Sequence, residues 1–218
     1  MPSNKSRVIP ARVPVEPQRR HGKERVAKLL EVGAAVFAEK GYEAATMAEI
    51  AERAGAPIGS LYRFFPNKEV LAEALITRCV GQIDVLFAEI NRQAEPAAPE
   101  KTADTLLRFL VDVQKETAVI AALLDMHSDR AAKRSQFRQI VLQHIVGTLH
   151  VLAPSLPSPL AEDIAIVLLN NMKMMKGMAG LRPKENVPTS PGAMEELRHM
   201  NRLYLADRLA AFLPPSGR

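Results

Sequence analysis

Side chains able to bind a nucleic-acid backbone fall close together between residues 46 and 68. Thr46 offers a hydroxyl, Tyr62 a phenol and Lys68 an ammonium. Groups of these types bond phosphate oxygens and fix a protein's register on a duplex without reading its sequence. Arg63 is the one guanidinium in the segment 58–64, and a guanidinium can give guanine two parallel hydrogen bonds. The chemistry indicated is the binding of a polyanion.

The residues that precede Arg63 are slim where a helix would have to approach a duplex. A helix in the major groove points its N-terminal residues at base edges, so that end must lack bulky acidic side chains. Ile58, Gly59 and Ser60 meet this condition, since Gly59 lets the backbone approach closely and Ser60 offers a hydroxyl. Ile58 can either contact a thymine methyl group or belong to the core of a small helical bundle.

Local signals place these residues on the second and third of three short helices. The first helix has apolar residues three and four positions apart and is expected to stop at Gly41. Thr46 opens the second helix with a capping-box pattern, and Gly55 ends it. Pro57 is expected at the first helical position of the third helix, at about 58–64. Two short helices so closely spaced are typical of a helix-turn-helix.

Longer amphipathic helices are predicted for the rest of the chain. Asn67 should cap one whose buried stripe is Leu71, Leu75, Cys79, Ile83, Leu86 and Ile90. Further stripes predict helices over residues 106–124 and 137–152, and two last helices at about 160–181 and 192–213. No strand pattern occurs in the sequence. We therefore predict an all-α protein of about nine helices, in which an antiparallel helical bundle follows the helix-turn-helix.

Charge is distributed unevenly along the 218 residues, whose net charge is +5. Residues 1–68 hold 12 Lys or Arg and 7 Asp or Glu, whereas residues 69–218 hold 17 of each. This asymmetry indicates a polyanion-binding N-terminal module on a neutral body.

Three domains are predicted from composition and pattern. Residues 1–20 are rich in Pro and Arg and should form a flexible basic arm, from which Arg19 and Arg20 could reach a minor groove. Residues 21–68 form the helix-turn-helix domain. Residues 69–218 are expected to bind an effector and to dimerise.

Several classes of protein are disfavoured. Cys79 is the single cysteine, which fits a reducing compartment such as the cytoplasm, and no signal peptide or membrane-spanning stretch is recognisable. Asp125, His127 and Asp129 are spaced by two, which on a helix splays side chains apart, so no metal site or other cofactor is expected. No nucleophile elbow or phosphate-binding glycine loop supports a helical enzyme.

The segment FAEKGYEAATMAEIAERAGAPIGSLYRFFPNKEVL, residues 37–71, resembles the DNA-binding domain of the TetR family of transcriptional regulators. The matching residues are Phe37, Gly41, Tyr42, Thr46, Ile50, Ala51, Ala54, Gly55, Gly59, Ser60, Leu61, Tyr62, Phe65, Lys68, Glu69 and Leu71. The resemblance implies phosphate contacts by Thr46, Tyr62 and Lys68. It also implies that Ile58, Gly59, Ser60 and Arg63 face the groove of a roughly palindromic operator.

Two residues depart from the family's pattern. Pro57 stands where a hydroxyl residue commonly caps the recognition helix, which removes a cap hydrogen bond of about 1 kcal/mol. Phe64 replaces the usual histidine or aromatic residue with a hydroxyl, which removes a polar contact to DNA. Arg63 is then expected to carry more of the sequence recognition.

The remaining predictions concern regulation. A small-molecule effector is expected to release a homodimeric repressor from double-stranded DNA; a constitutive DNA binder without effector is the alternative. Candidate effector-binding residues are Phe109, Leu124, His127, Met172 and Met175. The methionines could equally be core or dimer interface. Apolar residues of the last two helices exceed what one bundle face needs, which predicts a four-helix dimer interface: Val167, Leu168, Met175, Met178, Leu197, Met200, Leu203 and Tyr204.

Overall fold

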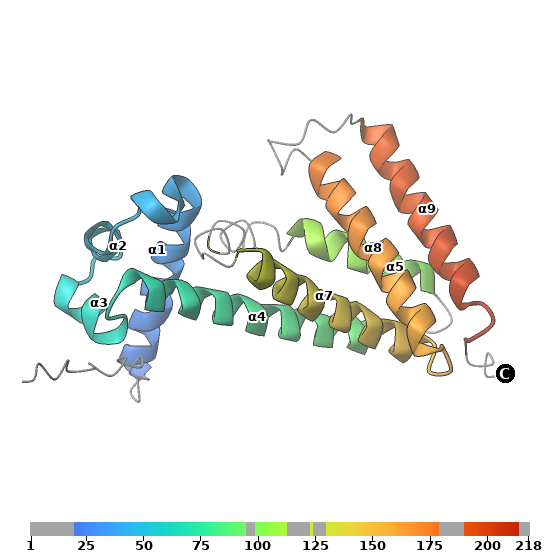
Figure 1. The fold of residues 1–218 in the computed structure, drawn as a ribbon, viewed down its shortest axis with the longest axis horizontal. Helices are drawn as coiled ribbons and strands as arrows, with labels where there is room; N and C mark the ends of the chain where they lie inside the picture. The colour runs from blue at the N-terminus through green and yellow to red at the C-terminus, as the bar shows by residue number, and fades with distance from the viewer. Residues whose placement is uncertain (1–19, 95–98, 113–122, 124–129, 179–189, 214–218) are drawn as a thin grey trace, which may run out of the picture. The chain divides into compact units, whose positions relative to one another are not determined.

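A computed structural model describes residues 20–94, 99–112, 123, 130–178 and 190–213, and these contain helices and no strand (Figure 1). The eight helices are α1 (Arg20–Ala44), α2 (Met47–Arg53), α3 (Ile58–Phe64), α4 (Lys68–Gln93), α5 (Pro99–Asp112), α7 (Arg130–Leu152), α8 (Ser158–Met178) and α9 (Pro191–Leu209). The predicted all-α class is confirmed. The predicted count of about nine remains a prediction.

The chain divides into two compact units, residues 1–77 and 78–218, and the division falls inside α4. We call them the N-terminal and the C-terminal unit. The predicted boundary at residues 68 and 69 stays a prediction, and each unit is described by itself.

Short-range signals determine where the helices of the N-terminal unit begin and end. Gly41, with φ 77° and ψ 168°, interrupts the helical backbone inside α1, as predicted. The Thr46 hydroxyl accepts a hydrogen bond from the Glu49 amide at 3.2 Å and caps α2. Gly55 follows α2 in a left-handed conformation, with φ 62°. These turns bring α2 and α3 together within one small bundle.

One expected position in this region is wrong by one residue. Pro57 is the N-cap of α3, with φ −55° and ψ 134°, so Ile58 is the first helical residue. An extended ψ of this kind is what an N-cap residue adopts before the helix starts. No side chain caps α3, as the sequence predicted from the missing hydroxyl.

The core of the N-terminal unit forms where α1 meets the other helices. Leu29, Phe37, Ile50, Leu61 and Leu71 are completely buried or nearly so. Gly33 permits the close approach of α1 and α4, because a Cβ atom at this position would lie 3.3 Å from Leu71 Cδ2. The small core holds α2 and α3 in place by packing.

The C-terminal unit has its own core, to which α4, α5, α7, α8 and α9 contribute. Figure 1 shows α8 and α9 lying antiparallel, and α5 packs against both of them. In α7, Val141, Ile145, Leu149 and Leu152 are buried as predicted, whereas Phe137 is only partly buried. The stripe predicted for α4 is confirmed with one exception. Leu86 is only partly buried and Phe87 is buried instead, because the stripe continues four rather than three residues after Ile83.

Polar contacts tie the helices of the C-terminal unit together. His144 on α7 lies 2.9 Å from Asp84 on α4 and stacks on Phe87, with ring centroids 4.8 Å apart. Between α8 and α9, the Asn171 amide donates to Asn201 Oδ1 at 2.8 Å, and Asn201 is completely buried. Within the described ranges, no helix is long and apolar enough to span a membrane.

We predict that Gly41→Ala lowers the free energy of unfolding by about 1–3 kcal/mol, because its backbone conformation is open essentially to glycine alone. The residue has space around it, so the effect would come from the backbone. Urea unfolding followed by circular dichroism measures it. Gly59→Ala is the matched control: its Cβ would meet nothing within 4 Å inside α3, so stability should stay equal or rise by up to about 1 kcal/mol. Equal losses in both variants would contradict the prediction.

Candidate nucleic-acid interface

Helix α3 has one buried and one exposed side. Leu61 and Phe64 are buried, whereas Ile58 is 43% and Tyr62 48% exposed. Gly59 and Arg63 are also exposed, one helical turn apart. The exposure of Ile58 excludes its assignment to the core of the bundle. Ile58, Gly59 and Arg63, three of the four residues predicted to face a groove, therefore lie on one accessible side.

Two further predicted residues are Thr46, at the start of α2, and Ser60, on α3, and the burial of Phe64 bears on one departure from the family pattern. Thr46 is exposed, and its hydroxyl keeps its own proton for a second partner while it caps α2. Ser60, in the first turn of α3, is half-buried. Phe64 is buried, so a polar side chain at this position would not lie on the exposed side of α3.

Lys68 has neighbours that its sequence position did not reveal. Its ammonium donates to the backbone carbonyl oxygens of Tyr42 at 2.8 Å, Glu43 at 3.1 Å and Ala45 at 3.1 Å. The same nitrogen lies 4.3 Å from the centroid of the Tyr42 ring. The Tyr42 hydroxyl donates to Glu69 Oε1 at 2.9 Å. Burial, followed by this hydrogen bond, raises the pKa of Tyr42 above its usual range.

A network of ion pairs connects α1 and α2. Arg53 lies 2.6 Å from Glu39 and 2.8 Å from Glu49, and Lys40 lies 2.6 Å from Glu49. The hydrogen bond from Lys40 is the main reason that the pKa of Glu49 lies below its usual value. Glu49, predicted as the second member of a capping box, thus directs its carboxylate to two cations.

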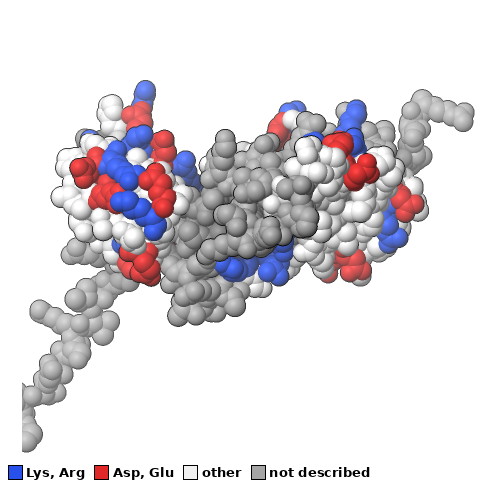
Figure 2. Space-filling view, turned by 90° about the horizontal axis from the view of Figure 1, so that it is seen from above, with Lys and Arg blue, Asp and Glu red and all other residues white. Residues whose placement is uncertain are grey.

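Basic and acidic side chains are interleaved over the N-terminal unit (Figure 2). Residues 20–68 hold eight Lys or Arg and six Asp or Glu. Residues 1–19 hold four Lys or Arg and one Glu. More than half of the net charge of the chain therefore belongs to residues 1–19, outside the described residues. Among the described residues, Arg63, Arg25 and Lys23 form no ion pair, so their charges are available to a partner.

A cleft of about 310 Å³ beside the helix-turn-helix was not predicted. It lies between the start of α1 and the turn that joins α2 to α3, and it is lined in part by His21, Arg25, Lys28 and Gly55. The signal in the sequence is the i, i+4, i+7 spacing of three basic residues, which places them on one face of a helix. Arg25 thus joins the candidate residues.

The other predicted residues are placed as follows. Arg20 opens α1 and pairs with Glu24 at 3.0 Å. Met172 and Met175 are buried in the core of the C-terminal unit. Arg19, Leu124, His127 and the side chain of Phe109 lie outside the described residues.

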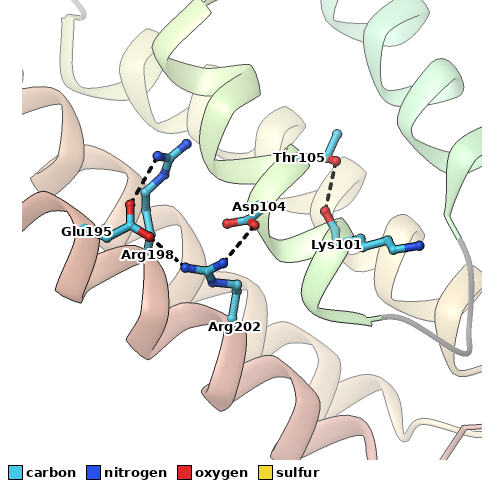
Figure 3. Close-up of polar contacts among 6 residues, drawn as sticks. All are labelled: Lys101, Asp104, Thr105, Glu195, Arg198 and Arg202. Atoms are coloured by element: carbon cyan, nitrogen blue, oxygen red, sulfur yellow. Dashed lines mark hydrogen bonds and ion pairs between the residues drawn. The ribbon is translucent and has the colours of Figure 1, made fainter.

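Charged residues also join α5 to α9 (Figure 3). Glu195 lies 3.4 Å from Arg198 and 2.8 Å from Arg202, and Arg202 reaches Asp104 of α5 at 3.5 Å. The side chain of Lys101 points away from this cluster in Figure 3. The described residues contain no group of three or more His, Cys, Asp or Glu that could hold a metal ion.

Comparisons with known proteins bear on the family. Residues 29–75 match the model of bacterial regulatory proteins of the tetR family. The transcriptional repressor KstR2 of Mycobacterium tuberculosis is 45% identical over 64 residues, which are 29% of this chain and 30% of that protein. The fatty acid metabolism regulator protein of Bacillus subtilis is 26% identical over 116 residues, 52% of this chain and 59% of that protein. The chain thus spans about 30% of the first of these relatives and 59% of the second.

Solved structures extend the likeness of the fold to most of the chain. A transcriptional regulator from Aquifex aeolicus VF5 has a TM-score of 0.60 at 24% identity, over 83% of this chain and 99% of that one. The regulator FadR from Bacillus subtilis, solved in complex with stearoyl-CoA, has a TM-score of 0.58 at 16% identity, over 82% of this chain and 96% of that one.

The fold and the exposed side of α3 define a helical protein with an N-terminal helix-turn-helix. Residues 29–75 match the TetR-family model, so the resemblance seen in the sequence is confirmed for this segment.

We predict that the region 39–53 loses stability in acid because Glu49 is held ionised by Lys40 and Arg53. A carboxylate with a lowered pKa stabilises the fold above its unfolded pKa of about 4.5, and this contribution is lost as the pH falls through the folded value. After correction for the intrinsic pH dependence of exchange, the protection of amides in this region should therefore fall below pH 4.5, and Glu49→Gln should weaken this pH dependence. Glu52→Gln, an exposed change on the same helix, is the control and should behave as wild type. An identical pH profile for Glu49→Gln and wild type would refute the prediction.

Proposed function

We propose that this protein is a sequence-specific DNA-binding transcriptional regulator, most simply a repressor, whose helix α3 enters the major groove. The observation that carries the proposal is the exposed side of α3. Leu61 is buried, whereas the residues on the other side of the helix are exposed to solvent: Ile58, Gly59, Tyr62 and Arg63. An apolar side chain can contact a thymine methyl group, and a guanidinium can recognise guanine. The comparisons with TetR-family repressors support this function for the N-terminal unit.

The roles of individual residues are part of the proposal. Arg63 and Ile58 contact base edges, Gly59 and Ser60 allow the backbone to come close, and Thr46 and Tyr62 bind phosphates. Arg25 adds a phosphate contact from α1, since it lines the cleft next to the turn and forms no ion pair among the described residues. Arg19 and Arg20 approach a minor groove at the end of the arm. Lys68, also expected to bind phosphate, is considered separately below.

The C-terminal unit is proposed to bind a small-molecule effector that releases the DNA. An effector can do so only if it has different affinities for the DNA-bound and the released arrangement. Met172 and Met175 are buried, and thioethers can adapt to an apolar ligand; Phe109, Leu124 and His127 complete the proposed site. Stearoyl-CoA, the ligand in the FadR structure, is a rational first probe. The protein would act where DNA is found, in the cytoplasm.

A homodimer built on α8 and α9 completes the proposal. Of the apolar residues predicted for this interface, Leu168, Met175, Met178 and Leu197 are buried in the core of their own unit. Exposed apolar side chains remain on both helices: Ile166, Val167, Met174, Met200 and Leu203. Exposed apolar residues gathered on two adjacent helices are typical of an interface, and a second copy presents the same surface under two-fold symmetry. The resulting dimer would place two copies of α3 on a palindromic operator.

The experiment that tests DNA binding is a footprint of the full chain on the DNA that flanks its own gene. We expect protection of a roughly palindromic site at low salt and its loss on addition of an effector, with stearoyl-CoA, apolar compounds and planar cations as probes. No protection at low salt would refute DNA binding. Protection that no probe removes favours the constitutive binder.

Arg63→Ala should weaken binding by about 1–3 kcal/mol at particular base pairs, because it removes a bidentate contact to a base. Titrations with operator variants, each changed at one base pair, measure this effect. Arg138→Ala, an exposed arginine on α7, is the control for loss of one charge. If Arg63→Ala weakens operator and random DNA equally, Arg63 binds phosphate and does not read bases.

Leu203→Glu should convert the dimer to a monomer, because a charge at a side chain 57% exposed in the single chain would be buried in the interface. Sedimentation at micromolar concentration distinguishes the dimer from the 23.9 kDa chain. Val85→Glu introduces the same charge at a side chain that is 69% exposed on α4, and this variant should remain dimeric. A monomeric wild type, or a dimeric Leu203→Glu, would contradict the proposed interface.

A further inference from the structure

The hydrogen bonds of Lys68 use its whole donor capacity. An ammonium has three N–H groups and no acceptor. In this structure it donates to three backbone carbonyls, those of Tyr42, Glu43 and Ala45. No N–H of Lys68 remains for a phosphate oxygen in this arrangement. Direct binding of DNA by Lys68 would therefore require it to give up bonds that it already has.

The three carbonyls lie where α1 ends and α2 is about to begin. Gly41 interrupts the helical backbone before them, and carbonyls beside such a break can be satisfied by a side-chain donor. Tyr42 and Glu43 belong to the last residues of α1, and Ala45 is a buried residue directly before Thr46. By bonding all three, Lys68 satisfies these carbonyl oxygens. It also holds in place the backbone that directly precedes Thr46.

The residue next to Lys68 strengthens the same joint. Glu69 accepts a hydrogen bond from the Tyr42 hydroxyl, so the first two residues of α4 both hold the end of α1. The Tyr42 ring also contacts Phe37, with centroids 5.5 Å apart, and Phe37 is completely buried. The joint between α1, α2 and α4 is therefore continuous with the core of the N-terminal unit.

We propose that Lys68 is a positioning residue, which sets the place of Thr46 and the start of α2 for DNA binding and does not itself bind phosphate. This inference rests on the proposed DNA-binding function. It assigns Lys68 a different role from the one that the family resemblance implies.

Two substitutions separate the two roles. Lys68→Met keeps the apolar stem and removes the charge. Lys68→Arg keeps the charge, but a planar guanidinium does not replace a compact ammonium among three converging carbonyls. Lys23→Ala removes one exposed charge from the same unit as the control. Affinities for operator and random DNA are titrated against salt at a temperature where all variants are folded, and amide exchange of residues 41–49 is measured without DNA.

If Lys68 positions the α1–α2 joint, both of its variants speed exchange in residues 41–49 and lower operator affinity about tenfold or more. Affinity for random DNA and the salt dependence change little, so the ratio of specific to non-specific affinity falls. A general loss of stability would not change this ratio in a fully folded protein. Lys23→Ala should leave exchange and the ratio as in wild type.

The opposite pattern overturns the inference. If Lys68 binds phosphate, Lys68→Arg binds like wild type, whereas Lys68→Met loses affinity for all DNA and its log–log salt slope falls by about 0.9. Exchange in residues 41–49 would then stay as in wild type in both variants. If the wild type binds no DNA, the proposed function fails, but exchange still decides whether Lys68 holds the joint. If both Lys68 variants exchange like wild type, the inference that Lys68 holds the joint is refuted.

Discussion

The close approach of α1 to α4 at Gly33 is the constraint on which the N-terminal unit depends. Leu71 fits against the bare backbone of Gly33, and a larger side chain there would have to displace it. This contact brings the first turn of α4 to the end of α1, where Lys68 and Glu69 find their partners. The helices α2 and α3 are too short to be stable by themselves, since isolated helices of this length are marginal in water. Their exposed side can carry polar and basic groups because α1 and α4 supply the burial.

Features that depend on neighbouring residues could be predicted from the sequence, and those that depend on distant residues could not. The caps at Thr46 and Asn67 and the break at Gly41 each follow from two or three adjacent residues, and all are present. The hydrogen bonds of Lys68 join residues 23 to 26 positions apart, so a basic residue beside a predicted DNA-binding helix gave no sign that it was already occupied. The exposure of Ile58 was likewise decided by which face of α3 packs.

The C-terminal unit illustrates the limit of periodicity. A stripe of apolar residues predicts that a helix packs, but core and subunit interface present the same pattern. Leu168 and Met175 were therefore grouped with Val167 and Met200, although the first two are buried within one chain and the other two are exposed. Asn201 shows the converse, because a polar residue in the middle of α9 is completely buried once Asn171 and a backbone carbonyl satisfy its amide. Pattern alone could not assign it to the core.

The division between the two units falls inside an uninterrupted helix, and this has a mechanical consequence. A loop between domains absorbs a change in length, but a helix converts each added or removed residue into 1.5 Å of translation and about 100° of rotation. The length of α4 therefore matters as much as the identities of its residues. A substitution on the surface of α4 leaves the register of the later residues unchanged, whereas an insertion or deletion shifts it for every helical residue that follows.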